Sequence, residues 1–564
     1  MKQKRSTFTA RSNRHDASIA AHTPVETEQP APACAIRTDF SRFHSGPTLR
    51  LSMLNAERVL WIWAAIVAAC VVWQPLLLGF YYDDWAQLVN GSTQGNPFSL
   101  TRFLFMNGID PPRPGLLPVR FLCSSMFGDH PLLWQGALLL VNCGVVVSIV
   151  AVGRALTQCR TAMGRTITAA AGLCWLLLPW NAATRFWPML LPNTLMIAVE
   201  GFLCVFLIRG WTKNQSRAIT AGGLYLWMCL SYEAFYLQWI PLVLIGIALW
   251  MAKRIRLRPV TVSAISLVAA QAVAGLWNVY TKLEGFGTVK HVFPNWSQVV
   301  RENLLNLVPA ILRSVSEISA EMALCGVIVI SLWLVVYVRS LSDASDRPAG
   351  NTSALLAGIS LLGGLLSVIV FSLGGRVVTA TGVETRSLMI FNFWVLIGAA
   401  ILTIFAIERL RRAPKLVFAF ALAGFGLCLA VGQVLRASDW VTAWNLQKKL
   451  LAEAPISDLK HTEPDGRIVI LNPRDVNGAP IFAAPWDINH AVPWAYPFLG
   501  SRRFIVYNPW EGRMNWDGKQ LSYAGQPALE TTTTLYLWRP SDISFWRPAG
   551  PFVINQNLTV EPAQ

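Results

Sequence analysis

Two adjacent carboxylates follow the first long apolar segment of the chain. Asp83 and Asp84 stand in the run GFYYDDWAQLVN, among aromatic residues of the kind that line membrane interfaces. A carboxylate that is partly desolvated at such a boundary has a raised pKa, which makes it a better base near neutral pH. The alternative is a solvated helix start, where acidic residues complement the helix dipole. The pair is therefore a candidate general base.

The composition shows what kind of element has to position these acids. Of the 564 residues, 54% are hydrophobic and only 14% are charged, and the mean hydropathy is +0.43. Soluble domains carry roughly a quarter of charged residues. The apolar residues gather in runs of about 20, which is the length that a helix needs to cross a bilayer. This pattern excludes a disordered chain, a disulfide scaffold and an ordinary soluble enzyme, and it predicts a polytopic α-helical membrane protein.

The apolar runs predict about eleven transmembrane helices. They lie near 59–79, 131–153, 166–183, 192–208, 218–232, 235–251, 259–280, 321–338, 353–373, 388–407 and 416–434. Alternate loops carry at least two basic residues each, and by the positive-inside rule these loops are cytoplasmic. The basic loops are 154–165, 209–217, 252–258, 339–352 and 408–415. The segments 80–130, 281–320, 374–387 and everything after 435 are then expected on the extracytoplasmic side.

Three regions follow from this topology. Residues 1–57 are polar and predict a disordered cytoplasmic tail, and residues 58–434 form the membrane domain. Residues 435–564 predict an extracytoplasmic soluble α+β domain, because the amphipathic run SDWVTAWNLQKKLLAEA precedes the strand-like runs RIVILN, RFIVYN and TTTTLYLW. The net charge of +16 lies mainly in the tail and the alternate loops, which argues against a nucleic-acid partner.

The sequence contains no motif for a soluble cofactor. It has no GxxxxGK[ST] loop, no GxGxxG after a strand and no HExxH. None of its ten cysteines lies after residue 428, and no CxxC or Cys/His spacing typical of a metal site is present. No cofactor is therefore assigned, and a divalent metal stays an open alternative.

Several short motifs follow one another in a suggestive order. Tyr82-Asp83-Asp84-Trp85 comes just after the first span, Arg113-Pro114 follows, and a G-x-x-P turn leads into the second span. Further on stand LLPWNAATRFWPMLLPN, CLSYEAF and GVETRSLMIFNFW. In their order and topological positions these motifs resemble the GT-C glycosyltransferases, among them the protein O-mannosyltransferases and the lipid A aminoarabinose transferases. The resemblance covers about residues 59–450.

The resemblance implies an inverting transfer of a sugar from a polyprenyl-phosphate donor, with a hexosyltransferase-like activity. Asp83 would be the general base on the acceptor hydroxyl, and Asp84 would orient it or the acceptor. The leaving phosphate needs fixed cations, and the planar fork of arginine suits it. Arg386 is the first candidate for donor-phosphate binding, followed by Arg376, Arg113 and Arg185. For each arginine the alternative is a side chain that reaches to lipid headgroups.

Other charged residues add weaker expectations. Glu233, in a very short outer turn, is expected to face the same cavity, where it would assist the acceptor or hold a divalent ion with the two aspartates. The alternative is a satisfied interfacial acid. Glu200 lies near the middle of the fourth span, where an ionisable side chain is costly, so a structural pairing is expected. Lys290 and His291, in a long outer loop, are candidates to contact the donor or acceptor, with a solvated pair as the alternative.

The favoured hypothesis is thus a membrane glycosyltransferase that acts on a glycan, lipid or protein acceptor. Its predicted place is the bacterial inner (cytoplasmic) membrane, among membrane lipid, with the N-terminus cytoplasmic, the active site and the C-terminus periplasmic. Two other functions stay open. One is a lipid-linked sugar transporter or flippase, although transporters bind near the bilayer midplane and here the acids and Gly/Pro breaks lie in outer loops. The other is a non-catalytic glycan-binding membrane protein.

Overall fold

The computed structural model describes residues 60–85 except 62, 113–157, 162–283, 295–316, 351–409 except 380, and 412–562 with short gaps. Residues 49–564 form one compact unit. The predicted tail at 1–57, the predicted span at 321–338 and the candidates Lys290 and His291 lie outside the described residues.

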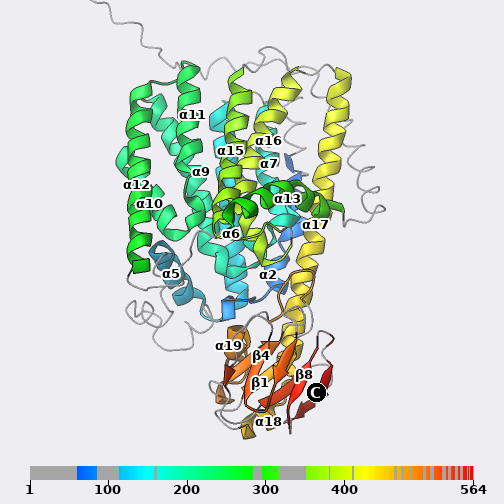
Figure 1. Cartoon of the computed structure of the whole chain (residues 1–564). Coiled ribbons are helices and arrows are strands. Elements are labelled where there is room, and N and C mark those ends of the chain that lie inside the picture. The colour runs from blue at the N-terminus through cyan, green and yellow to red at the C-terminus, as the bar shows by residue number, and fades with distance from the viewer. Residues whose placement is uncertain are drawn as a thin grey trace, which may run out of the picture. The chain divides into compact units, whose positions relative to one another are not determined.

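The membrane part is a bundle of helices, in which α6 and α9 pack along each other, as do α15 and α16 (Figure 1). Its longer helices are α6 (Pro131–Thr157), α7 (Ala162–Cys174), α9 (Leu191–Thr212), α10 (Ala218–Ser231), α11 (Trp239–Met251), α12 (Leu257–Leu283), α13 (Trp296–Ser316), α15 (Asn351–Leu373), α16 (Met389–Arg409) and α17 (Arg412–Ala452). The shorter ones are α2 (Gln74–Leu77), α5 (Leu117–Phe127) and α8 (Ala182–Phe186), with the 3-10 turns η3 (Pro114–Leu116), η4 (Trp175–Leu177), η5 (Pro179–Asn181), η6 (Pro188–Leu190), η7 (Glu233–Phe235) and η8 (Val383–Leu388).

Six helical stretches of the described residues are long and apolar enough to cross a membrane, which makes the chain an integral membrane protein. They are Pro131–Thr157, Pro188–Thr212, Glu233–Met251, Leu257–Thr281, Thr352–Leu373 and Val383–Ala406. Each of them contains or overlaps a predicted span. The predicted spans at 59–79 and 218–232 correspond to shorter apolar helices, Trp63–Leu77 and Ala218–Ser231. The total of about eleven spans and the orientation of the termini stay predictions.

The predicted span at 166–183 is broken in the structure. Gly164–Leu177 and Pro179–Phe186 form a helix pair bent by 65°. The cause is Pro179, because a residue before proline is pushed out of the helical region, and Leu178 has the extended values φ −64° and ψ 112°. The chain after the break runs through η5, α8 and η6, three short buried turns.

The predicted boundary at 434/435 falls inside a helix. The single helix α17 runs through it for 41 residues, a length of about 60 Å, and includes both the last predicted span and the predicted amphipathic helix. The long apolar start and the polar end of α17 share one helical backbone. The end of α17 therefore carries the start of the C-terminal region without a break in the hydrogen-bonded helix.

The C-terminal region contains strands at all three predicted runs. A four-stranded sheet has the order β2-β1-β6-β7 and a five-stranded sheet has the order β5-β4-β3-β8-β9. Strand β1 pairs in parallel with β2 and with β6, where Val469 lies between Ile505 and Leu537, and the other pairings are antiparallel. The strands are β1 (Arg467–Leu471), β2 (Arg503–Tyr507), β3 (Met514–Trp516), β4 (Gln520–Tyr523), β5 (Leu529–Glu530), β6 (Leu535–Arg539), β7 (Ser544–Trp546), β8 (Phe552–Ile554) and β9 (Val560–Pro562), with α18 (Ile456–His461), α19 (Pro485–Ala495) and η9 (Pro497–Leu499) between them.

The buried side chains form three clusters. Among the described residues, one fills the helical bundle and another joins the four-stranded sheet to the five-stranded sheet. The remaining cluster joins Tyr81 and Trp85 of the first outer segment to Phe186, to Trp440 of α17 and to Ile488 of α19. The C-terminal region thus shares a hydrophobic core with the segment that carries the candidate base. Its extracytoplasmic placement stays a prediction.

Candidate functional site

The two aspartates sit on a tight turn that begins at Tyr81. The N–H groups of Asp84 and Trp85 donate to the carbonyls of Tyr81 and Tyr82 at 3.1 and 3.2 Å. Tyr82 has φ +48°, in the left-handed region that bulky residues rarely occupy. Such a conformation costs roughly 1–3 kcal/mol and persists only where the surroundings enforce it, often at functional sites. The turn therefore points Asp83 and Asp84 in directions that a regular helix could not provide.

Asp84 is fully buried and held by backbone N–H groups. The N–H of Tyr81 donates to Oδ2 at 2.8 Å, and the N–H of Met189 donates to Oδ1 at 2.8 Å. Burial raises the pKa of Asp84 well above its ordinary value, and these two hydrogen bonds oppose the rise. Both oxygens of Asp84 thus accept a hydrogen bond, and Asp84 joins the turn to η6, far along the sequence. Its role is to hold the turn in place.

Asp83, by contrast, is only half-buried and lies among charged neighbours. The pKa of the adjacent Tyr82 is sensitive to them: it is raised to about 12, chiefly by burial and in part by the negative charges of Asp83 and Asp487, while Arg386 opposes the rise. Asp83 and Arg386 therefore act on the same phenol, although 302 residues separate them in the sequence.

Arg386 comes from η8, at the start of α16. Its Nη2 donates to Glu384 Oε1 at 2.8 Å, and its guanidinium carbon lies 5.4 Å from the centre of the Trp187 ring. Arg376 donates to the same Glu384 oxygen at 3.3 Å. Two guanidinium groups thus share one carboxylate, so positive charge is left over. Arg386 is 15% exposed and Arg376 51% exposed, which suits a cation pair that meets an anionic ligand at a surface.

The broken segment after Pro179 holds the two halves of the site together. The N–H of Met189 binds Asp84, and the Trp187 ring packs on Arg386. The N–H of Ala183 donates to Thr385 Oγ1 at 2.8 Å, which fixes η8. The segment LLPWNAATRFWPMLLPN therefore contributes no acid but positions both the carboxylates and the arginine.

Arg185, in the same segment, has a different place. It is 4% exposed, its Nη2 donates to Gln74 Oε1 at 2.8 Å, and its Nη1 donates to the carbonyl of Leu176. These bonds tie the broken segment to the first helix and to the end of η4. The structure thus places Arg185 among structural partners instead of beside Arg386.

Arg113 and Glu233 form a second charged pair. Arg113 Nε donates to Glu233 Oε2 at 2.9 Å, and the guanidinium carbon lies 4.9 Å from the centre of the Tyr232 ring. Burial raises the pKa of Tyr232, and the charges of Arg386, Arg113, Glu233 and Glu384 all act on it. Tyr232 therefore stands between the two charged pairs. Tyr232 thus links the pair of Arg113 and Glu233 to Arg386, which shares Glu384 with Arg376. The roles of these residues in a reaction stay predictions.

Glu233 does not join the aspartates in a metal cluster. Within the described residues, no group of three or more His, Cys, Asp or Glu side chains could hold a metal ion. Glu233 instead neutralises Arg113. Glu200, as expected, has a structural partner: it is fully buried, and Trp394 Nε1 donates to its Oε1 at 3.0 Å and to Gln238 Oε1 at 2.9 Å.

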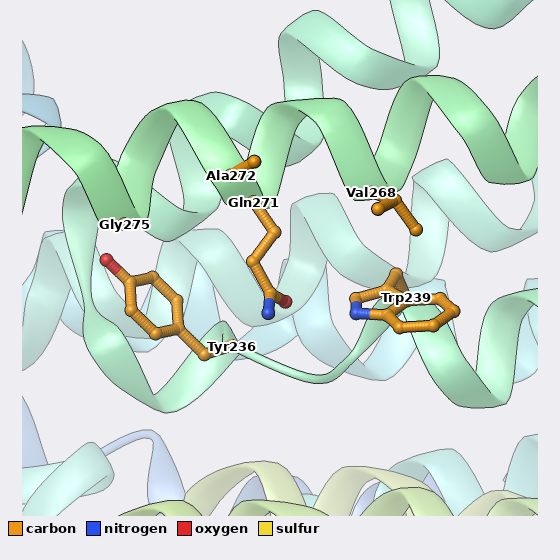
Figure 2. Close-up of a pocket in the computed structure, with 6 residues that line it drawn as sticks. All are labelled: Tyr236, Trp239, Val268, Gln271, Ala272 and Gly275. Carbon is orange, nitrogen blue, oxygen red and sulfur yellow. The ribbon is translucent and has the colours of Figure 1, made fainter.

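A cavity of about 370 Å³ lies near Glu233, between the end of η7 and α12 (Figure 2). It is lined by Tyr236, Trp239, Val268, Gln271, Ala272 and Gly275. The side-chain oxygen Oε1 of Gln271 already accepts the N–H of Leu237 at 2.9 Å and accepts the Tyr225 hydroxyl at 3.2 Å. Because its polar atoms are engaged locally, this cavity offers space but no acid, base or cation.

Sequence reasoning missed the part that the C-terminal region takes in the site. Asp487, in the first turn of α19, is fully buried and adds negative charge beside Tyr82 and Asp84. Trp85 is fully buried, and its Nε1 donates to Gln447 Oε1 of α17 at 2.9 Å. The only signal in the sequence was a lone Asp at a helix start, which is common in proteins and indicates no function.

Comparison with known proteins gives a likeness in structure and none in sequence. No family model and no curated protein matches the chain. Two crystal structures of ArnT from Cupriavidus metallidurans align with 79% of this chain and 85% of theirs. The structure bound to undecaprenyl phosphate has 10% identity and a TM-score of 0.39, and the apo structure has 11% and 0.37. ArnT is a GT-C glycosyltransferase, the class that the motifs of this sequence resemble.

Proposed function

We propose that the protein is an inverting membrane glycosyltransferase that takes a sugar from a polyprenyl-phosphate donor. The observation that supports the proposal is that the charges of Asp83 and Arg386 act on each other and on Tyr82, while two backbone N–H groups hold Asp84 on the same turn. A base and a pair of arginines next to each other, in a chain with several membrane-crossing helices, fit a donor whose tail lies in lipid and whose phosphate lies at the interface.

The residues divide the reaction between them. Asp83 accepts the proton of an acceptor hydroxyl as its oxygen attacks the anomeric carbon. The bond from that carbon to the phosphate oxygen breaks, so the configuration inverts and the electron pair leaves with the polyprenyl phosphate. Arg386 and Arg376 stabilise the negative charge that develops on this phosphate. General-base help of this kind contributes roughly 10²–10⁴-fold.

Asp84 and Arg113 support this chemistry in different ways. Asp84 accepts two backbone N–H bonds, so it fixes the strained turn from which Asp83 projects. Arg113, bound to Glu233, borders the same space through Tyr232 and would contact the donor phosphate or the acceptor. We place the site on the extracytoplasmic side of the inner membrane, with a glycan, lipid or protein as acceptor.

The substitution Asp83→Asn tests the proposal because it removes the base and keeps the size of the side chain. In membranes supplied with a sugar on undecaprenyl phosphate, we expect transfer to fall about 10²–10⁴-fold while donor binding is retained. Asp458→Asn, an exposed acid of α18, is the matched control and should transfer at the wild-type rate.

Two results would contradict the proposal. If Asp83→Asn keeps wild-type transfer, Asp83 is not the base. If the wild-type protein moves the lipid-linked sugar across the membrane, forms no glycoside, and keeps that flux after Asp83→Asn, the protein is a flippase instead. A non-catalytic glycan-binding protein would show neither transfer nor flux.

A further inference from the structure

Helix α13 runs across the direction of the long helices and contacts α15 (Figure 1). The contact is at the end of α15, because Asn303 of α13 binds Ser372, the residue before the last of that helix. The stretch Thr352–Leu373 is long and apolar enough to cross a membrane, so its end marks the edge of an apolar layer. This contact places α13 where a bilayer meets water.

The exposed surface of α13 is divided between apolar and polar side chains, each recurring at four-residue steps. The apolar row is Leu304, Val308 and Leu312, and the polar row is Gln298, Glu302 and Asn306. Side chains four residues apart share one side of a helix, so each row has a side of its own. Within the polar row, Gln298 Nε2 donates to Glu302 Oε1 at 2.8 Å. The buried Asn303 and Leu307 form the side that faces the protein.

The two exposed rows suit a helix that lies in the plane of a membrane surface. There, lipid covers the apolar side and water covers the polar side. In water alone the apolar row would stay an exposed hydrophobic patch, with Val308 60% and Leu312 61% exposed. Another protein could also cover such a row. The position at the end of a membrane-crossing helix, with a polar row alongside, favours lipid.

The buried side of α13 holds the backbone on which Arg376 stands. Asn303 is 1% exposed, and its Nδ2 donates to Ser372 Oγ at 2.8 Å and to the carbonyl of Arg376 at 2.7 Å. Its Oδ1 accepts the N–H of Val378 at 2.9 Å. Both ends of one side-chain amide thus bind the segment that follows α15, and this segment carries one of the two arginines that share Glu384.

The end of α15 fixes the same segment from the other side. Gly375 has φ +71°, and its N–H donates to the carbonyl of Ser372 at 2.9 Å. The N–H of Arg376 donates to the carbonyl of Phe371 at 3.2 Å. A left-handed glycine with these two bonds is a Schellman motif, which ends a helix. The Arg376 backbone is therefore held by α15 through its N–H and by Asn303 through its carbonyl, while its side chain is 51% exposed.

We propose that α13 lies on the lipid surface and that Asn303 is a positioning residue, which holds Arg376 at the level of the donor phosphate. This inference rests on the proposed function. The phosphate of a polyprenyl donor lies where its lipid tail meets water, which is the level that an interfacial helix takes. Because the apolar row keeps α13 at that level and Asn303 joins α13 to Arg376, the lipid surface sets the height of this arginine.

A double-mutant cycle tests the link from Asn303 to Arg376. Asn303→Ala removes all three hydrogen bonds, so we expect kcat/KM for a sugar on undecaprenyl phosphate to fall about tenfold. In the Arg376→Gln background the same substitution should cost less than about twofold, because no guanidinium is left to misplace. Asn306→Ala, at an exposed position of the same helix, is the matched control and should keep the wild-type kcat/KM.

A merely structural role of Asn303 would give another result, because the backbone that it binds is present in both backgrounds. Equal losses in the two backgrounds therefore overturn the proposal, and so does a folded Asn303→Ala protein with the wild-type kcat/KM. If Asn303→Ala fails to accumulate in membranes, Asn303→Asp decides, since it keeps an oxygen for the Val378 N–H and loses the amide that binds the Arg376 carbonyl. A loss that disappears in the Arg376→Gln background supports the proposal, and the wild-type kcat/KM overturns it.

Photo-crosslinking tests the lipid contact without any activity. With Val308 replaced by benzoylphenylalanine, irradiation of intact membranes should give adducts with phospholipid. The same replacement of Asn306, on the polar row, is the control and should give far fewer. Adducts of position 308 with a second copy or another protein, in place of lipid, overturn the proposal. A wild-type protein whose position 308 contacts lipid but which transfers no sugar overturns the proposed function instead.

Discussion

The protein holds buried carboxylates in two regions whose surroundings differ. At the outer turn, Asp84 accepts two backbone N–H bonds and lies next to Asp83, within a group of acids and arginines that includes Glu384, Arg386 and Arg376. Inside the bundle, the hydrogen-bond partner of Glu200 among the described residues is neutral: it is the indole of Trp394, which also binds Gln238. Its Oε2 has no hydrogen-bond partner within the described part of the chain.

This difference distinguishes a carboxylate in a reactive site from one that has only a structural role. Fixed cations near a carboxylate can bind an anionic ligand and stabilise negative charge that develops in a reaction. Asp84 and Glu200 are both fully buried and both accept hydrogen bonds from neutral N–H groups, so neither burial nor the direct partners separate them. What differs is that Asp84 adjoins Asp83 on a turn whose Tyr82 is affected by the charge of Arg386, whereas the hydrogen-bond donor of Glu200 is an indole of the bundle. The following predictions test this distinction, from the largest expected effect to the smallest.

Among these substitutions, the largest effect is expected for Arg386→Gln. It removes a cation that interacts electrostatically with Asp83, and it leaves Glu384 with Arg376 alone. Loss of one such charge at the leaving group costs about 10²–10³-fold in transfer. Arg209→Gln, an exposed arginine at the end of α9, should be silent. Transfer assays on both variants check this, and comparable losses in the two would remove the distinction between the regions.

Asp84→Asn should disturb both stability and activity. Asparagine replaces one of the two accepting oxygens by an NH₂ group, which cannot accept, so one of the N–H groups of Tyr81 and Met189 loses its partner, at a cost of about 1–3 kcal/mol. Because burial raises the pKa of Asp84, its protonation favours the folded state. The contribution of Asp84 to the free energy of unfolding is then complete at a pH below its ordinary pKa of about 4. It declines as the pH rises through the higher pKa that Asp84 has in the folded state.

Thermal unfolding in detergent measures this effect. The difference between the wild type and Asp84→Asn should be largest at acidic pH and shrink towards neutral pH. A difference that grows with rising pH would show that the two backbone bonds outweigh burial and keep Asp84 ionised.

A smaller effect is expected from the pair of Arg113 and Glu233. The two side chains are 17% and 27% exposed and are joined at 2.9 Å, so solvent screens their attraction in part. A double-mutant cycle with Arg113→Gln and Glu233→Gln should give a coupling of about 1 kcal/mol in unfolding free energy. Transfer by Glu233→Gln should stay within about fivefold of the wild type. A much larger loss of transfer would assign Glu233 to the chemistry.

The smallest effect is expected for Glu200→Gln. Glutamine keeps an oxygen that accepts the Trp394 N–H and removes an ionisable group from the bundle. The unfolding free energy should change by less than about 1 kcal/mol, and transfer should stay at the wild-type level. Glu200→Leu, which removes the acceptor as well, should cost about 1–3 kcal/mol. Loss of transfer in Glu200→Gln would place a function in the bundle and contradict the comparison.

Much of the membrane architecture could be predicted from the sequence. A helix must satisfy its own backbone hydrogen bonds in lipid, so a long apolar run allows few structures. The runs at 131–153 and 353–373 therefore became α6 and α15. The strand-like runs RIVILN and RFIVYN likewise became β1 and β2. The predicted boundary at 434/435 falls inside the single helix α17, because a change of polarity along the sequence does not by itself end a helix.

The sequence by itself determined which side chains could do chemistry: an acidic pair after an aromatic run, and arginines at the ends of apolar segments. Only the tertiary structure decided their division of labour. Asp84 is locked by Met189, Arg185 is turned towards Gln74 and Leu176, and Asp487 is brought in from the C-terminal region. The physical reason is that residue type sets what a group can donate, accept or ionise, whereas burial and neighbours, which come from distant segments, set which of these it does.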